Sequence, residues 1–269
     1  MDGFIDCLTR GKRSEAACGD EVEVTRTSPG EGVIERRLPR HTVLMRADAF
    51  RSKVFAANVT QVFVVIAPRP AFSDELVNRC LVASEAEGVP AVIVVNKSDL
   101  ADSLPETLAR TGPWQDAGYP VLTVCANSDV SHLLPLLAGH TTVLVGQSGM
   151  GKSTLMNAVI PSAARRVADI SARLDSGRHT TTHAVMHHVE SGGLLIDSPG
   201  VQAFGLAHLT AAQIEHAFPE FRPFLGRCRF RDCRHGPEPG CKLVDAAYRN
   251  EIAGSRLDSF RSLVGEARP

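Results

Sequence analysis

The chain has 269 residues, is 43% hydrophobic and 22% charged, and carries a formal net charge of -1 at pH 7. This length and composition suffice for one sizeable core with smaller satellites. The near-neutral charge excludes a strongly basic protein, so any nucleic-acid surface must be local. No apolar stretch approaches the ~20 residues that span a bilayer, and residues 1–6 lack the basic start and long apolar segment of a secretory signal. We therefore expect a cytoplasmic protein without a membrane partner. We also expect a monomer, although composition does not set the oligomeric state.

The N-terminal residues carry short strand-like pieces followed by a basic zone. Residues 21–24 and 33–36 flank a cluster of turn residues at 27–32. Residues 35–53 are then rich in arginine. These features predict a small β module over residues 1–53.

From residue 54 to residue 205, apolar strands alternate with helical patterns. Residues 73–88 have a serine cap, acids in the first turn and a glycine at the end, as expected for a helix. The alternation predicts an α/β fold with a mostly parallel sheet, helices on both faces and a ligand at the carboxyl ends of the strands. The expected strands are residues 61–67, 91–95, 121–125, 142–145 and 194–196.

A candidate guanine-recognition segment, Asn96-Lys97-Ser98-Asp99, follows the apolar run 91–95. The Asp99 carboxylate can accept hydrogen bonds from the ring N–H and the exocyclic amine of guanine. Adenine has an acceptor in place of that ring N–H and would leave the carboxylate unpaired, so GTP is favoured over ATP. We expect Asn96 to contact the other edge of the base and the stem of Lys97 to lie along its face. On its own, such a short segment is more often a solvated turn.

Residues 146–153 fit the pattern G-x-x-x-x-G-K-[ST] of a phosphate-binding loop. An apolar run precedes the loop and a helical pattern over residues 153–160 follows it, and this context disfavours a simple glycine-rich turn. The glycines let backbone N–H groups close around the β-phosphate. Lys152 would bridge phosphate oxygens, and the Ser153 hydroxyl would bind Mg²⁺.

The remaining nucleotide contacts are expected further along the chain. Asp197 ends an apolar strand and Gly200 follows it, which places a carboxylate near Mg²⁺ and a backbone N–H near the γ-phosphate. The polar segment 177–182 should supply a threonine to the Mg²⁺ shell; we favour Thr181, and spacing also permits Thr180 or Thr182. The expected cofactor-binding residues are Asn96, Lys97, Ser98, Asp99, Gly146, Gln147, Ser148, Gly149, Met150, Gly151, Lys152, Ser153, Thr154, Asp197 and Gly200.

Two positions depart from common GTPase patterns. Cys125 follows the strand at 121–125, where a third base-contacting loop usually carries serine. Val201 occupies the place of the glutamine that often orients the attacking water. His179 or Gln202 is expected to orient the water instead. The alternative for His179 is a solvated loop residue without a catalytic role. Either case predicts slow intrinsic hydrolysis until a partner orders the loop.

A second constellation has the spacing C-x4-C-x-H-x5-C. Three thiolates and one imidazole fill a tetrahedral shell, which indicates structural zinc over free cysteines or disulfides in a chain without a secretory segment. The surrounding stretch is basic with interleaved phenylalanines, which suits RNA phosphates and base stacking, although a solvated face is the alternative. Residues 246–264 are expected to form one or two helices. The expected metal ligands are Cys228, Cys233, His235 and Cys241.

The order of these motifs resembles the RsgA/YjeQ family of circularly permuted GTPases, the small-ribosomal-subunit-dependent GTPases. The resemblance implies an N-terminal OB-fold over residues 1–53, a circularly permuted P-loop GTPase domain over 54–205 and a helical zinc-binding domain over 206–269. The motifs that carry it are residues 96–99, 146–153, 177–182, 197–200 and 228–241.

The resemblance also implies a function. It implies hydrolysis of GTP to GDP and phosphate, stimulated by the small ribosomal subunit and its rRNA, late in maturation of that subunit. His179 would replace the missing glutamine as a catalytic residue, alongside Lys152 and Thr181. The alternatives are a nucleotide-gated module that contacts a protein partner or a metal-handling target, and an ATPase.

One departure concerns the N-terminus. Family members usually have more residues before the segment that resembles residues 8–24, so we expect the first strands of the OB barrel to be missing. Either the start codon is misassigned or trimmed, or the module is a reduced sheet with an exposed edge.

Overall fold

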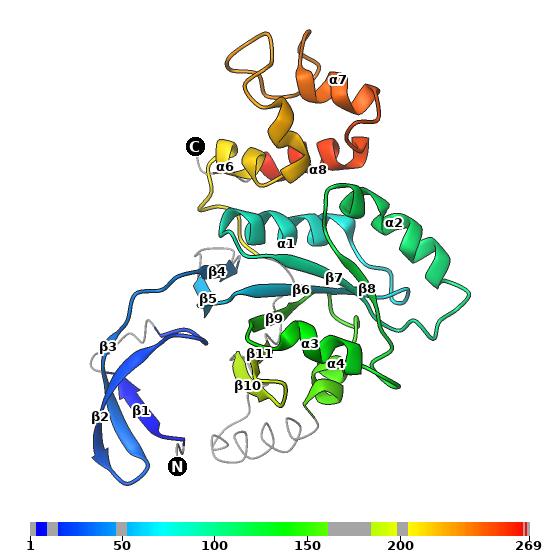
Figure 1. Cartoon of the computed structure of the whole chain (residues 1–269). Helices are drawn as coiled ribbons and strands as arrows, with labels where there is room; N and C mark the ends of the chain where they lie inside the picture. Colours follow the sequence, from blue (N-terminus) through cyan, green and yellow to red (C-terminus); the bar gives the residue numbers. More distant parts are fainter. Residues whose placement is uncertain are drawn as a thin grey trace.

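The computed structural model describes residues 4–9, 16–46, 53–160, 184–197, 204–265 and 267. Figure 1 shows a small N-terminal β region, a central sheet covered by helices on both faces, and a C-terminal helical region that packs above α1 (Asp74–Ala86). None of the described helices combines the length and apolar character needed to cross a membrane.

A six-stranded sheet with the order β10-β11-β9-β6-β7-β8 forms the centre of the protein. Its neighbouring strands pair in parallel, apart from the antiparallel pair of β10 and β11 at one edge. Every residue of β6 and β7 is buried, as expected for strands covered on both faces. The five strands expected from the sequence are confirmed as β6 (Gln61–Ile66), β7 (Ala91–Val95), β8 (Val121–Thr123), β9 (Thr141–Val145) and β11 (Gly193–Asp197), and the sixth strand, β10, covers Val185–Val189.

Helices cover both faces of this sheet (Figure 1). On one face lie α1, which begins after the predicted serine cap, and α2 (Leu104–Asp116). The Ser73 hydroxyl accepts a hydrogen bond from the Leu76 N–H at 3.3 Å, so the helix start predicted from the sequence is confirmed. On the other face lie η1 (Ser131–Leu133), α3 (Leu134–Leu137) and α4 (Lys152–Val159).

The strand order creates a switch point at the middle of the sheet. The chain runs outward from β6 through β7 to β8 and then returns to β9, on the other side of β6. The loops after β6 and β9 therefore diverge from adjacent strand ends. In open α/β sheets, ligands bind at the carboxyl ends of the strands at such a point.

Two small sheets make up the N-terminal region. The first has the order β1-β3-β2 and contains β1 (Asp6–Thr9), β2 (Val22–Ser28) and β3 (Glu31–Arg37); the second pairs β4 (Val43–Arg46) with β5 (Lys53–Ala57). The pair of β2 and β3 confirms the two predicted strand-like pieces. β5 spans the boundary expected between residues 53 and 54, and its Phe55 ring stacks on Phe204 with centroids 5.5 Å apart.

The C-terminal region consists of α6 (Ala211–His216), η2 (Pro219–Phe224), α7 (Lys242–Tyr248) and α8 (Gly254–Val264). The helical pattern over 246–264 therefore corresponds to two helices. Three stacked or edge-on rings, Phe218, Phe221 and Phe260, form the core of this region.

A buried polar network joins this C-terminal region to the central domain. The Arg256 guanidinium on α8 is 1% exposed and donates from Nε to Glu220 Oε1 at 2.6 Å. It also donates to the Asn78 side-chain oxygen on α1. Trp114 Nε1 on α2 donates to that same oxygen at 2.7 Å, and Asn78 Nδ2 donates to the Ser259 hydroxyl. Three helices from two regions therefore share one amide.

Candidate nucleotide and metal sites

The phosphate-binding loop connects β9 to α4 at the switch point. Gly146 has a φ of +139° and Gly151 a φ of +88°, values that favour glycine. A Cβ at Gly146 would lie 2.2 Å from the Val65 carbonyl oxygen, and one at Gly151 would lie 2.3 Å from Asn96 Nδ2. Both positions require glycine because the loop passes directly against its neighbours.

Lys152, Ser153 and Thr154 form the first turn of α4, at the end of the loop. The Lys152 ammonium donates to the carbonyls of Gly146 at 2.6 Å and Gln147 at 3.0 Å, so it lies inside the loop. Burial lowers the pKa of Lys152, while the negative charge of Asp197 acts in the opposite direction. The two loop carbonyls are neutral acceptors for the Lys152 ammonium. A phosphate bound at this helix N-terminus would give the ammonium an anionic partner.

Asn96 connects three loops at the carboxyl edge of the sheet. Its side chain is 1% exposed. Its Nδ2 donates to the Met150 carbonyl in the phosphate-binding loop at 3.0 Å, and its Oδ1 accepts from the Ala126 N–H in the third loop at 3.1 Å. The sequence predicts a base contact for Asn96; the structure adds a positioning role, which no local sequence signal indicates.

Lys97 lies between the phosphate-binding loop and the loop that follows β6. Its backbone has a φ of +60°, and its ammonium donates to the Gly149 carbonyl at 2.7 Å and the Arg69 carbonyl at 2.8 Å. The side chain therefore connects the guanine-recognition segment to both of these loops. Ser98 contributes a backbone N–H to the Val124 carbonyl, which fixes the segment to the end of β8.

Asp99 is exposed at the end of this segment, with one carboxylate oxygen 3.2 Å from the Cys125 sulfur. A thiol donates one hydrogen bond, as a serine hydroxyl does. Cys125 thus orients the carboxylate expected to recognise guanine, even though the sequence departs from the usual serine there.

The segment predicted to contact the γ-phosphate is described only at its start. Asp197 ends β11, which pairs with β9, and lies opposite Leu144 one strand away from the phosphate-binding loop. Its negative charge opposes the lowering of the Lys152 pKa by burial, so the two groups are near enough to interact electrostatically. The predicted residues His179, Thr180, Thr181, Thr182, Gly200 and Gln202 lie outside the described residues.

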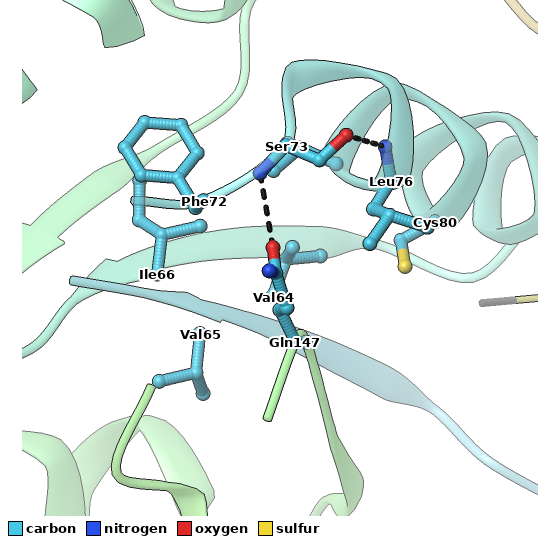
Figure 2. A pocket seen from close by; sticks show the side chains of 10 residues that line it. Val64, Val65, Ile66, Phe72, Ser73, Leu76, Cys80 and Gln147 are labelled. Carbon is cyan, nitrogen blue, oxygen red and sulfur yellow. Dashed lines mark hydrogen bonds between the residues drawn. The ribbon is translucent and has the colours of Figure 1, made fainter. Parts of the chain in front are cut away.

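A small apolar pocket lies between the phosphate-binding loop, β6 and the start of α1 (Figure 2). Gln147 reaches from the loop across this pocket, and its Oε1 accepts a hydrogen bond from the Ser73 N–H at 3.1 Å. Cys80 on α1 also lines this pocket, and burial raises the pKa of its thiol to about 12. The lining is too apolar for a nucleotide. The Gln147 side chain instead connects the loop to the start of α1.

The four predicted metal ligands converge in the C-terminal region. The ligand atoms of Cys228, Cys233, His235 and Cys241 all lie within 4.8 Å of one another. His235 Nδ1 is 3.7 Å from the Cys228 and Cys233 sulfurs and 3.3 Å from that of Cys241. Tetrahedral zinc bond lengths separate neighbouring ligands by ~3.5–3.8 Å, so this donor set fits a closed metal site.

These features define the class of protein. A phosphate-binding loop, a guanine-recognition segment and a terminal strand aspartate meet at the switch point of a doubly wound sheet. Because the guanine-recognition segment precedes the phosphate-binding loop in the chain, the class is a circularly permuted P-loop GTPase.

The chain belongs to the RsgA GTPase family, whose family model matches residues 37–207. A protein of Nitrosospira multiformis named small ribosomal subunit biogenesis GTPase RsgA is 49% identical over 263 residues, covering 98% of this chain and 84% of the relative. A protein of Burkholderia pseudomallei with the same name is 47% identical over 268 residues, covering 98% and 85%.

Two solved structures share the fold. YjeQ from Thermotoga maritima superposes with a TM-score of 0.74 at 29% identity, covering 97% of this chain and 88% of that one. YloQ, described as a circularly permuted GTPase, superposes with a TM-score of 0.72 at 27% identity, covering 99% and 87%.

Proposed function

We propose that this chain hydrolyses GTP to GDP and phosphate in the cytoplasm during biogenesis of the small ribosomal subunit. The observation that carries the proposal is the convergence on Asn96, where the guanine-recognition segment, the phosphate-binding loop and the third loop are joined. Such an arrangement can hold the base and the phosphates of one nucleotide in a fixed relation. The relatives named small ribosomal subunit biogenesis GTPases match nearly the whole chain, which supports the biological context.

Each site residue has a proposed role in the reaction. Backbone N–H groups of residues 146–151 and the Lys152 ammonium bind the phosphates, and the Asp99 carboxylate selects guanine. Bound Mg²⁺ would neutralise charge on the phosphates, held by the Ser153 hydroxyl with Asp197 nearby. We assign the remaining Mg²⁺ contact to Thr181.

We propose His179 as the residue that orients the attacking water, because Val201 supplies no polar group there. Replacing His179 with alanine should remove stimulated turnover and leave GTP affinity unchanged, whereas Gln202→Ala should leave both unchanged. If His179→Ala turns over GTP normally, or if Gln202→Ala alone loses turnover, the assignment is wrong.

We propose zinc as the metal in the C-terminal site, because three sulfurs and one imidazole nitrogen fill a tetrahedral shell without an open position. This metal would pin residues 228–241, the metal-binding loop, against α8. The proposed role is structural.

The metal-binding loop is also the proposed rRNA contact. Its arginines are exposed, and Phe230 is 44% exposed with the Arg229 guanidinium 5.4 Å from its ring centroid. Guanidinium groups bind phosphates and exposed rings stack on bases, so the pairing suits single-stranded or looped RNA. The exposed arginines around the loop are Arg227, Arg229, Arg231 and Arg234.

Co-sedimentation with purified small ribosomal subunits tests the proposed partner. The wild-type chain should pellet with subunits in a non-hydrolysable GTP analogue and much less in GDP. Arg229→Ala/Arg231→Ala should weaken pelleting, whereas Arg249→Ala, an exposed arginine paired with Glu251, should not. Failure of the wild type to pellet under the analogue would instead favour a nucleotide-gated module with a protein partner.

A further inference from the structure

The ring of His235 is held from two sides by different elements. Its Nδ1 faces the three cysteine sulfurs, and its Nε2 lies 3.1 Å from Glu215 Oε1 on α6. We infer that Glu215 is a positioning residue of the metal centre, which accepts a hydrogen bond from Nε2–H and so presents Nδ1 to the metal. The inference rests on the proposed zinc.

The chemistry of imidazole explains why such an acceptor matters. A histidine that binds a metal through Nδ1 must carry its proton on Nε2, and the partner of that proton fixes both the tautomer and the ring orientation. The His235 side chain is 6% exposed and that of Glu215 is 24% exposed, so little water competes for the proton. Among the described residues, Glu215 is the acceptor that Nε2 contacts.

Other contacts to His235 act on different atoms. Arg261 Nε donates to the His235 carbonyl at 2.8 Å, and the Phe260 ring meets the imidazole edge-on at 5.8 Å. These contacts hold the backbone, which has a φ of +59°, and limit the tilt of the ring. They do not distinguish a ring with Nδ1 toward the metal from one turned by half a rotation. Glu215 makes that distinction. Its carboxylate accepts a hydrogen bond from Nε2–H, and this leaves Nδ1 unprotonated, as binding to a metal requires.

The position of Glu215 gives the contact a further consequence. α6 starts at a capping box formed by Thr210 and Gln213, shortly after the segment that leaves the GTPase domain. In that segment the Gly205 N–H donates to the Met45 carbonyl of β4, and Phe204 stacks on Phe55. The His235–Glu215 bond therefore fastens the metal-binding loop to the first helix after the nucleotide domain.

Zinc release to a colorimetric chelator, together with zinc affinity by competition, tests the inference on the full-length protein. Glu215→Ala should weaken zinc binding by ~10–100-fold and speed release correspondingly. Glu215→Gln should show a smaller loss, because its amide oxygen still accepts from Nε2–H but carries no charge. His216→Ala, an exposed change on the same helix, should match the wild type.

The outcomes separate this inference from the proposed zinc. Wild-type protein that binds no zinc would overturn both. Wild-type protein that binds zinc, with Glu215→Ala and Glu215→Gln releasing it at the wild-type rate, would overturn the role of Glu215 alone. Guanine nucleotide affinity should be unchanged in all three variants, and this shows that each is folded. If Glu215→Ala does not bind nucleotide normally, Glu215→Gln is the test: an intermediate loss of zinc affinity supports the role of Glu215, and wild-type affinity overturns it.

Discussion

Asn96 Nδ2 donates a hydrogen bond to the Met150 carbonyl oxygen at 3.0 Å across 54 residues of sequence. This bond joins the segment that recognises the base to the loop that binds the phosphates. In Asn96→Ala the Met150 carbonyl and the Ala126 N–H both lose a buried partner, at about 1–3 kcal/mol each. We expect GDP affinity to fall at least about tenfold, measured by titration of a fluorescent analogue. Asn127→Ala, an exposed neighbour, is the control, and equal affinities in the two variants would contradict the positioning role.

Asp99 is predicted to set the choice of base. Asp99→Asn replaces a carboxylate acceptor with an amide whose donor suits the 2-oxo group of xanthine. We expect GTP affinity to fall by ~10²-fold or more and xanthosine triphosphate to bind better than GTP. Asp102→Asn, an exposed change three residues away, should leave the preference for guanine intact. An unchanged preference in Asp99→Asn would favour another basis for nucleotide selection.

The thiol of Cys125 is predicted to act as a serine hydroxyl would, because its sulfur lies 3.2 Å from the Asp99 carboxylate. Cys125→Ser should bind GDP as tightly as the wild type or slightly more tightly, since a hydroxyl is the stronger donor. Cys125→Ala should bind about two- to tenfold more weakly, which corresponds to the ~0.5–1.5 kcal/mol of one hydrogen bond. Equal dissociation constants for the serine and alanine variants would remove Cys125 from the site.

Arg256 is predicted to determine how firmly the C-terminal region docks on α1. Arg256→Met leaves the Glu220 carboxylate buried without its cation, a change that costs about 3–5 kcal/mol. Arg222→Met is the matched control, because Arg222 pairs with Glu85 at the same interface but is 41% exposed, and its loss should cost under about 1 kcal/mol. The midpoint of urea unfolding measures both. Similar shifts in the two variants would show that the Arg256 network does not anchor this interface.

Much of the sheet could be predicted from local patterns. The strands β6, β7 and β9 contain continuous apolar runs, as expected for strands buried on both faces, and Asn96 and Gly146 directly follow β7 and β9. The start of α1 was equally clear because the Ser73 cap and the acids behind it act within one turn. By contrast, α2 contains Gly112 and Pro113 and has no side-chain cap, which hides its helical pattern.

Features that depend on distant pairing could not be predicted. β4 and β5 are short and lie in or beside an arginine-rich stretch, so neither has a local pattern that indicates a strand. Their antiparallel pairing is seen only in the structure. The sequence placed Asn96 at the base, whereas its burial and its two loop contacts depend on where Met150 and Ala126 lie in space. Glu215 is one of 30 acidic residues in the chain, and no local pattern distinguishes it.

GTP turnover measured with and without purified small ribosomal subunits tests the central claim most directly. We predict slow turnover of the protein alone and a large increase with subunits. Asp99→Asn should show the same increase with xanthosine triphosphate in place of GTP. Turnover that subunits leave unchanged, for the wild type with GTP and the variant with xanthosine triphosphate alike, would contradict the assignment of this chain to small-subunit biogenesis.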